Sequence, residues 1–115
     1  MVEHKMGLYK EGFDLIQSGN KKIEIRLNDK KRQQIKEGDI IIFYLLPERN
    51  EFVTVRICSL KKFETFKESY TKIDFNLLGR ADKTNEWMLA ASYDLYSRED
   101  ELHFGILAIE FEKLK

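Results

Sequence analysis

Residues 19–28 read GNKKIEIRLN, and this stretch decides how the first half of the chain folds. From residue 22 to residue 28 apolar and polar residues alternate, which predicts a strand with two different faces. The apolar face carries Ile23, Ile25 and Leu27, and the polar face carries Lys22, Glu24, Arg26 and Asn28. Gly19 stands where a helix commonly ends in a left-handed residue, so we predict a short helix over residues 11–18 and a turn into the strand.

The rest of the chain predicts further strands and helices around this one. Short apolar runs rich in β-branched and aromatic residues predict strands at residues 40–45, 52–57 and 106–112, the first two paired antiparallel through the loop around Pro47. Helical spacing of apolar residues predicts helices over residues 63–73 and 84–95, and Ser97 predicts the start of another that ends at Gly105. Residues 74–83 show no period and are expected to form a surface loop.

These elements place the chain in the α+β class, as a partly closed antiparallel β-barrel flanked by short helices. A doubly wound parallel sheet would need regular β-α-β alternation and a glycine-rich first turn, and the sequence has neither. A length of 115 residues suits one domain over residues 1–115. Its 43% hydrophobic residues can build one core, so we expect folding without a disulfide or a metal.

The cysteine and histidine content bounds the chemistry. The single cysteine, Cys58, lies in an apolar run and is expected to be buried, as a small hydrophobic side chain with no partner for a disulfide. His4 and His103 stand near opposite ends without a cysteine cluster, so we expect neither a metal site nor another cofactor. No apolar stretch approaches the roughly 20 residues that cross a bilayer, so we expect a cytoplasmic protein that does not bind membranes.

The charges balance overall but are unevenly distributed. There are 20 lysines and arginines against 20 aspartates and glutamates, which speaks against coating nucleic acid by bulk electrostatics. Residues 21–36 nevertheless hold seven basic residues and two acidic ones, whereas residues 97–112 hold one basic residue and five acidic ones. We therefore expect a basic side and an acidic side, of which the acidic side is a candidate surface for an unknown protein partner.

The predicted strand also carries a candidate ligand site. Glu24 and Arg26 are two residues apart on one strand face, so their side chains emerge roughly 6.5–7 Å apart and can form an ion pair. Lys21, at the mouth of the strand, can reach a phosphate or a carbonyl as a compact charge. On spacing alone, the solvated face of an ordinary edge strand explains these charges better.

A resemblance to a known family favours a ligand site over a solvated strand face. The pattern Gly19-x-Lys21-x-x-Glu24-x-Arg26 resembles the GxKxxExR signature of the ASCH domain (activating signal cointegrator homology), a branch of the PUA-like superfamily. Further segments similar to the family in their order are residues 4–6, 26–29, 35–43, 96–99 and 105–109, and Gly12 stands where a proline is frequent. The resemblance implies a PUA-like β-barrel with an RNA-binding cleft, lined by Lys21, Glu24 and Arg26 and with Gly19 in a backbone role.

Some ASCH-like proteins resemble amidohydrolases that act on acetylated cytidine with a threonine, the signature lysine and a distant glutamate. Here Glu24 occupies the threonine position, and the distant acid could be Glu64, Glu68 or Asp74. A carboxylate beside an arginine is a poor substitute for an attacking hydroxyl, which argues against this route. If the chain is an enzyme, of amidohydrolase or ribonuclease type, its candidate catalytic residues are Lys21 and Glu24.

Residues around the signature extend the candidate site for RNA, a nucleotide or a nucleoside. Lys22 and Asn28 share the polar strand face, and Tyr93 and Tyr96 are candidates for stacking against bases. Trp87 is expected in the core instead. The basic residues after the strand form either a phosphate-contacting extension or a solvated loop, namely Lys30, Lys31, Arg32 and Lys36.

Overall fold

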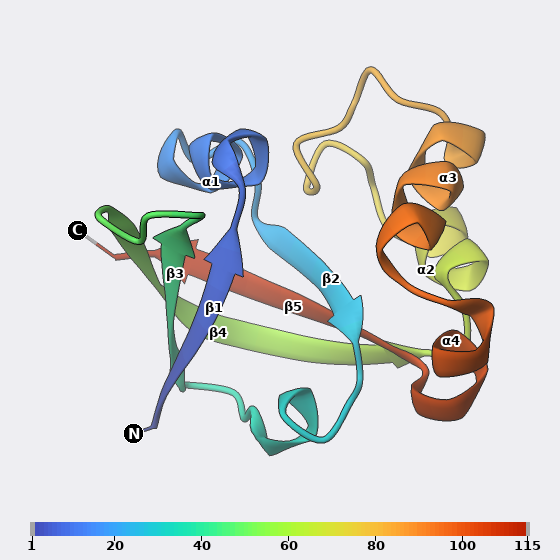
Figure 1. The fold of residues 1–115 in the computed structure, drawn as a ribbon, viewed down its shortest axis with the longest axis horizontal. Helices are drawn as coiled ribbons and strands as arrows, with labels where there is room; N and C mark the ends of the chain where they lie inside the picture. Colours follow the sequence, from blue (N-terminus) through green and yellow to red (C-terminus); the bar gives the residue numbers. More distant parts are fainter. Residues whose placement is uncertain (1, 115) are drawn as a thin grey trace.

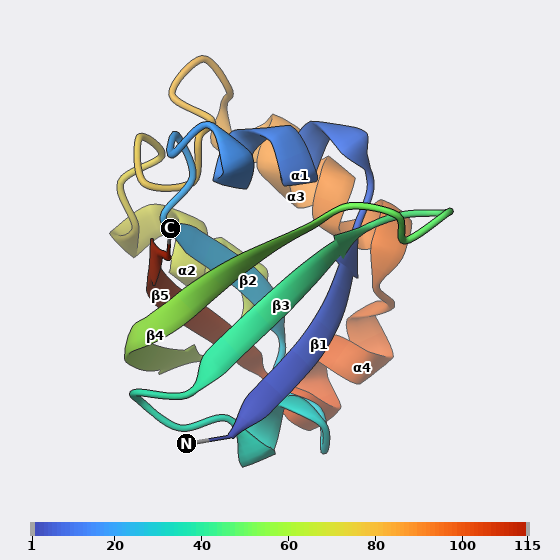
Figure 2. The ribbon, with the colours of Figure 1, turned by 90° about the vertical axis from the view of Figure 1, so that its left-hand side faces the viewer.

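The structure is a computed structural model that describes residues 2–114. In chain order its elements are β1 (Glu3–Leu8), α1 (Lys10–Gln17), β2 (Ile23–Leu27), the short 3-10 helix η1 (Arg32–Gln34), β3 (Ile40–Leu45), β4 (Phe52–Phe63), α2 (Phe66–Lys72), α3 (Asn85–Leu95), α4 (Arg98–Phe104) and β5 (Ile106–Lys113). Within these residues the strands form one sheet in the order β1-β3-β4-β5-β2. Figures 1 and 2 show the sheet curled into a half-barrel.

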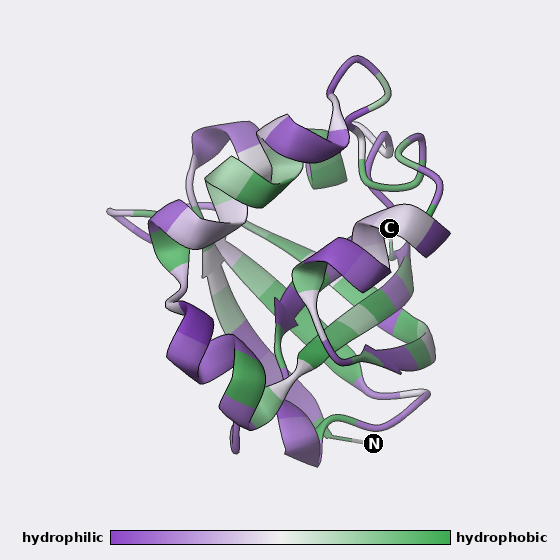
Figure 3. Ribbon diagram, turned by 90° about the vertical axis from the view of Figure 1, so that its right-hand side faces the viewer, coloured by the Kyte–Doolittle hydropathy of each residue, from purple (hydrophilic) through white to green (hydrophobic). Residues whose placement is uncertain are grey.

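Each face of the sheet covers its own hydrophobic core. The first core lies inside the half-barrel, where α1 closes one end with Phe13 and Ile16. The second core lies between the sheet and helices α2 and α3, around Phe66. In Figure 3 the hydrophobic residues concentrate on the strands, while the helices alternate between hydrophilic and hydrophobic positions. The outer face is therefore covered at β2 and β5, whereas Arg56 and Cys58 of β4 remain exposed.

The fold predicted from the sequence is confirmed, with one strand added. The predicted half-barrel and its antiparallel β3–β4 pair are present. The caps expected at Thr84 and Ser97 are formed, and Gly105 ends α4 with a φ of 71°. Strand β1 was missed because only Met6 in it is fully buried, and its pairing with β3 is parallel, so the barrel is not purely antiparallel.

Three expectations about single residues are wrong. Phe63 belongs to β4 and not to a helix, because it pairs with Ile106 and the cap at Thr65 starts α2 after it. Cys58 is exposed, because it lies on the opposite side of β4 from the buried Val53, Val55 and Ile57. Trp87 is 41% exposed and not in the core, since it sits in the first turn of α3 with its ring against Arg80 and Lys83.

The predicted loop at residues 74–83 contains neither a helix nor a strand. It is more firmly placed than its sequence indicates, because Leu78 is buried in the second core and the carbonyl of Leu77 accepts hydrogen bonds from the amides of Lys22 and Ile23. Among residues 2–114, no helix combines the length and the apolar character needed to cross a bilayer.

Candidate ligand-binding cleft

The turn before β2 aims the polar face of this strand into the half-barrel. Gly19 has a φ of 83° and ends α1, and the amide of Lys21 then donates to the carbonyl of Leu15. In the β2–β5 ladder Glu24 lies opposite Ile109, which belongs to the first core, inside the half-barrel. Cross-strand partners point to the same face of a sheet, so the Glu24 side chain points inward and is only 4% exposed. The polar face of β2 is therefore not a solvated face.

Lys21, Glu24 and Arg26 form an ion-paired trio. The ammonium of Lys21 lies 2.6 Å from Oε1 of Glu24, and Nε of Arg26 donates to Oε2 at 2.7 Å. Burial raises the pKa of Glu24, but the two cations and their hydrogen bonds outweigh burial and lower its pKa from 4.5 to about 2. The carboxylate is thus ionised at neutral pH, and the trio carries a net charge of +1.

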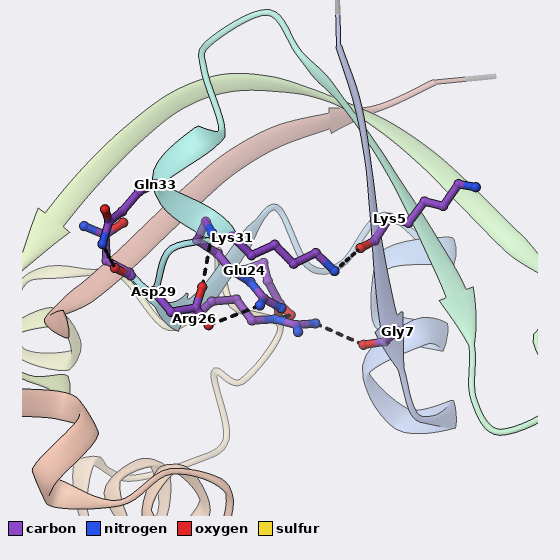
Figure 4. A network of polar contacts seen from close by, with 9 residues as sticks. Lys5, Gly7, Glu24, Arg26, Asp29, Lys31 and Gln33 are labelled. Carbon is purple, nitrogen blue, oxygen red and sulfur yellow. Dashed lines mark hydrogen bonds and ion pairs between the residues drawn. The ribbon is translucent and has the colours of Figure 1, made fainter. Parts of the chain in front are cut away.

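Arg26 also joins the two open edges of the sheet. Its Nη2 donates to the carbonyl of Gly7 on β1 at 3.0 Å (Figure 4). Lys31 makes a similar bond from the segment after β2, to the carbonyl of Lys5 at 2.9 Å. Burial lowers the pKa of Arg26, but the charge and hydrogen bond of Glu24, together with smaller contributions from Tyr96 and Asp29, outweigh burial and raise this pKa. Side chains, in place of a backbone ladder, therefore connect β1 to β2 and hold the guanidinium in one orientation.

The trio lines a cleft of about 400 Å³. Its other walls come from β1 and the start of α1, from the loop after β3, and from α2, α3 and the segments next to α3. The lining residues are Gly7, Leu8, Tyr9, Lys21, Glu24, Ile25, Arg26, Leu46, Phe66, Tyr70, Leu78, Arg80, Trp87, Met88, Ala91, Ser92, Leu95 and Tyr96. Mostly apolar and aromatic walls around a small polar group are typical of a small-ligand site.

Three tyrosine and phenylalanine rings form the wall opposite the trio. Phe66 lies between Tyr70 and Tyr96, with ring centroids 6.2 Å and 5.5 Å away and nearly parallel planes. The hydroxyl of Tyr70 lies 2.6 Å from Oγ of Ser92, and burial raises the pKa of Tyr70 to about 12. Burial also raises the pKa of Tyr96. Both phenols are protonated at neutral pH and can donate hydrogen bonds.

The structure brings together only part of the predicted site. Lys21, Glu24, Arg26 and Tyr96 line the cleft, and Gly19 acts through the backbone turn. Three candidates lie elsewhere, each for a visible reason. Lys22 is exposed and does not line the cleft, Asn28 lines a separate cavity beside α4, and the Tyr93 hydroxyl donates to Glu101.

The basic extension and the candidate acids also lie outside the cleft lining. Lys31 bonds to the backbone of Lys5, and Arg32 pairs with Asp29. Glu64 and Glu68 line the separate cavity, and Asp74 accepts from the amide of Asn76. Among the described residues, Glu24 is the one carboxylate in the lining of the cleft, and no group of three histidine, cysteine, aspartate or glutamate side chains is placed to hold a metal ion.

Sequence reasoning missed several lining residues, mostly because their positions resembled core positions. Tyr70 and Met88 follow helical apolar spacing and do lie in the core, yet each also faces the cleft. One feature of the sequence could have pointed to Arg80 as a cleft residue, namely Gly79 directly before it. That glycine has a φ of 69°, and a Cβ added to it would lie 3.4 Å from Cβ of Lys21, so the loop at residues 74–83 docks against the signature turn.

Comparisons with known proteins agree on one family. The ASCH domain profile matches residues 6–115. The crystal structure of hypothetical protein PH0355 is 35% identical, covers 98% of this chain and 100% of its own, and has a TM-score of 0.87. The solution NMR structure of PF0455 from Pyrococcus furiosus is also 35% identical, covers 99% of both chains and has a TM-score of 0.79. No curated protein matches.

The crystal structure of an ASCH domain from Lactobacillus crispatus shares the fold, with 18% identity, a TM-score of 0.62, and coverage of 96% of this chain and 79% of its own. The profile match spans the signature turn, the half-barrel and the helices that wall the cleft. The resemblance noted from the signature is therefore confirmed over nearly the whole length. This chain belongs to the ASCH domain family.

Proposed function

We propose that this chain is a binding module that holds one nucleotide, free or within RNA, in the cleft of the ion-paired trio. One observation supports the proposal most strongly. The trio carries a buried net charge of +1 and lines, together with aromatic side chains, a cleft of about 400 Å³. A nucleotide combines a flat base with polar edges and an anionic phosphate. Single-stranded RNA sites commonly meet these groups with aromatic rings and basic side chains.

Each member of the trio has its own role in this proposal. Lys21 contacts the phosphate or a base carbonyl, because an ammonium has three N–H donors and Glu24 needs one of them. Arg26 presents a planar guanidinium to the ligand, fixed by Glu24 on one side and by the Gly7 carbonyl on the other. Glu24 orients both cations and does not touch the ligand. Tyr96 supplies the stacking surface.

An NMR titration tests the proposal. Nucleosides, nucleoside 5′-monophosphates and short unstructured RNAs are added to the isotope-labelled protein. We expect shifts concentrated on residues that line the cleft, and we expect Lys21→Ala to require much higher ligand concentrations to produce them. Lys22→Ala is the matched control, because it removes the same charge one residue away, at an exposed side chain that does not line the cleft. The assignment would be refuted by shifts that are absent, that lie outside the cleft, or that Lys21→Ala shows at the same ligand concentrations as the wild-type protein.

Hydrolysis of an acetylated-cytidine-like amide or of RNA is the alternative, and the geometry supports it less. A carboxylate with a pKa of about 2 is a weak general base near neutral pH, so Glu24 is poorly suited to activate water. The three candidate distant acids do not line the cleft. Incubation with acetylated cytidine and with RNA oligomers decides the matter. Turnover that Lys21→Ala removes would establish an enzyme and displace the binding-module proposal.

A further inference from the structure

The rim of the cleft exposes an unusual share of large apolar side chains. Within residues 2–114 six such side chains are exposed, and three of the six line this cleft, namely Tyr9, Trp87 and Leu95. Isolated exposed apolar residues are ordinary, whereas their gathering at one opening marks an interaction site. Trp87 contributes the largest ring, and it is the only tryptophan in the chain.

Two cations lie against the Trp87 ring. The guanidinium carbon of Arg80 is 5.5 Å from the ring centroid, and the ammonium of Lys83 is 4.6 Å from it. Arg80 also lines the cleft and forms an ion pair with Glu11 of α1, which places it between the helix and the ring. The ring and the two cations form what we call the rim platform. It joins a stacking surface to positive charge at the cleft mouth.

The loop does not depend on Trp87 to hold its place. Leu78 anchors the loop in the second core, and the Leu77 carbonyl accepts from two amides at the signature turn. Lys83 has one carboxylate neighbour within ion-pair distance, Asp82 at 3.6 Å, which is itself exposed. Such a surface pair contributes little, so the ammonium of Lys83 is available to another anion.

We propose that the rim platform binds a second nucleotide, adjacent in sequence to the one in the cleft. The inference rests on the proposed function and names its ligand class, single-stranded RNA of two or more nucleotides in preference to a free nucleotide. The second base stacks on Trp87, and Lys83 moves from the ring face to the phosphate that joins the two nucleotides. A tryptophan face accepts any base, so this contact adds affinity without sequence preference.

The test compares a nucleoside 5′-monophosphate with an unstructured RNA hexanucleotide. In the wild-type protein we expect the hexanucleotide to bind about tenfold more tightly, within the range that one stacked base gives. It should also change the fluorescence of Trp87, the sole tryptophan. Trp87→Ala should reduce the affinity ratio of the two ligands towards one, and Trp87→Phe should restore part of it. Phe52→Ala, which removes an exposed ring outside the cleft, should leave the ratio unchanged.

Salt dependence provides a second readout. Each phosphate contact with single-stranded nucleic acid contributes about 0.7 to the slope of log affinity against log salt. Lys83→Gln should reduce that slope by about this amount for the hexanucleotide and leave it unchanged for the monophosphate. Equal affinities of the two ligands for the wild-type protein, or a ratio that Trp87→Ala does not change, would overturn the rim platform while leaving the cleft assignment intact. If neither ligand binds, both proposals fail.

Discussion

Replacing Glu24 by glutamine should destabilise the protein in a pH-dependent way. The change keeps the size of the side chain but leaves Lys21 and Arg26 without their shared anion. A pKa lowered from 4.5 to about 2 corresponds to about 3 kcal/mol of stabilisation near neutral pH, at about 1.4 kcal/mol per pKa unit. The loss expected when one partner of a buried pair is removed, about 3–5 kcal/mol, is of the same order.

The sign of the pH effect follows from the lowered pKa. Stabilisation by the Glu24 charge is complete above the unfolded-state pKa near 4.5, and it is lost as the pH falls towards the folded-state pKa of about 2. At pH 3 much of that stabilisation is gone, so the wild-type protein approaches the behaviour of the variant. The difference in unfolding free energy between the two should shrink by about 2 kcal/mol from pH 7 to pH 3.

Urea unfolding followed by circular dichroism at pH 7, 5, 4 and 3 measures that difference. Glu51→Gln, at an exposed position in the loop before β4, controls for loss of a surface carboxylate. A difference between wild type and Glu24→Gln that stays constant across this range would refute the ion-paired state of Glu24. So would a Glu24→Gln variant as stable as the wild type at pH 7.

Two further predictions concern the backbone and the exposed thiol. Gly105→Ala should cost about 1–3 kcal/mol in chemical denaturation and clearly more than Gly38→Ala, because both residues have positive φ but only at Gly105 would a Cβ meet a backbone atom, the oxygen of Phe63 at 3.1 Å. Equal losses would contradict this. Cys58 should react with a thiol reagent in the folded protein without denaturant, though more slowly than a free thiol, since burial and the nearby Glu112 raise its pKa. Labelling that requires unfolding would contradict its exposure.

The sequence predicted the elements well where one physical rule decided them. The alternation of Ile23, Ile25 and Leu27 defined β2, and side-chain caps at Thr84 and Ser97 marked the helix starts. Strand β1 escaped because it sits at the sheet edge with Met6 as its one fully buried residue, so a period of two is not visible in it. Only its tertiary pairing with β3 makes it a strand.

The sequence identified the charged residues at the centre of the candidate site but did not predict that they are buried. Spacing showed that Glu24 and Arg26 could pair, yet it favoured a solvated face, because nothing local reveals that a curled sheet encloses the polar side of β2. Trp87 was misplaced for the complementary reason. Its helical spacing is that of a core residue, and only the tertiary structure shows that its ring lines the cleft and stays 41% exposed.

The central claim is that the ion-paired trio binds a nucleotide, and one affinity comparison tests it most directly. The dissociation constant of an unstructured RNA hexanucleotide is measured by calorimetry for the wild-type protein, Lys21→Ala and Lys22→Ala. A charge-assisted hydrogen bond to the ligand is worth about 1.5–3 kcal/mol, so Lys21→Ala should weaken binding about 10-fold to 150-fold. Lys22→Ala should change it less than about threefold. Equal losses in the two variants, or no loss in either, would contradict the claim.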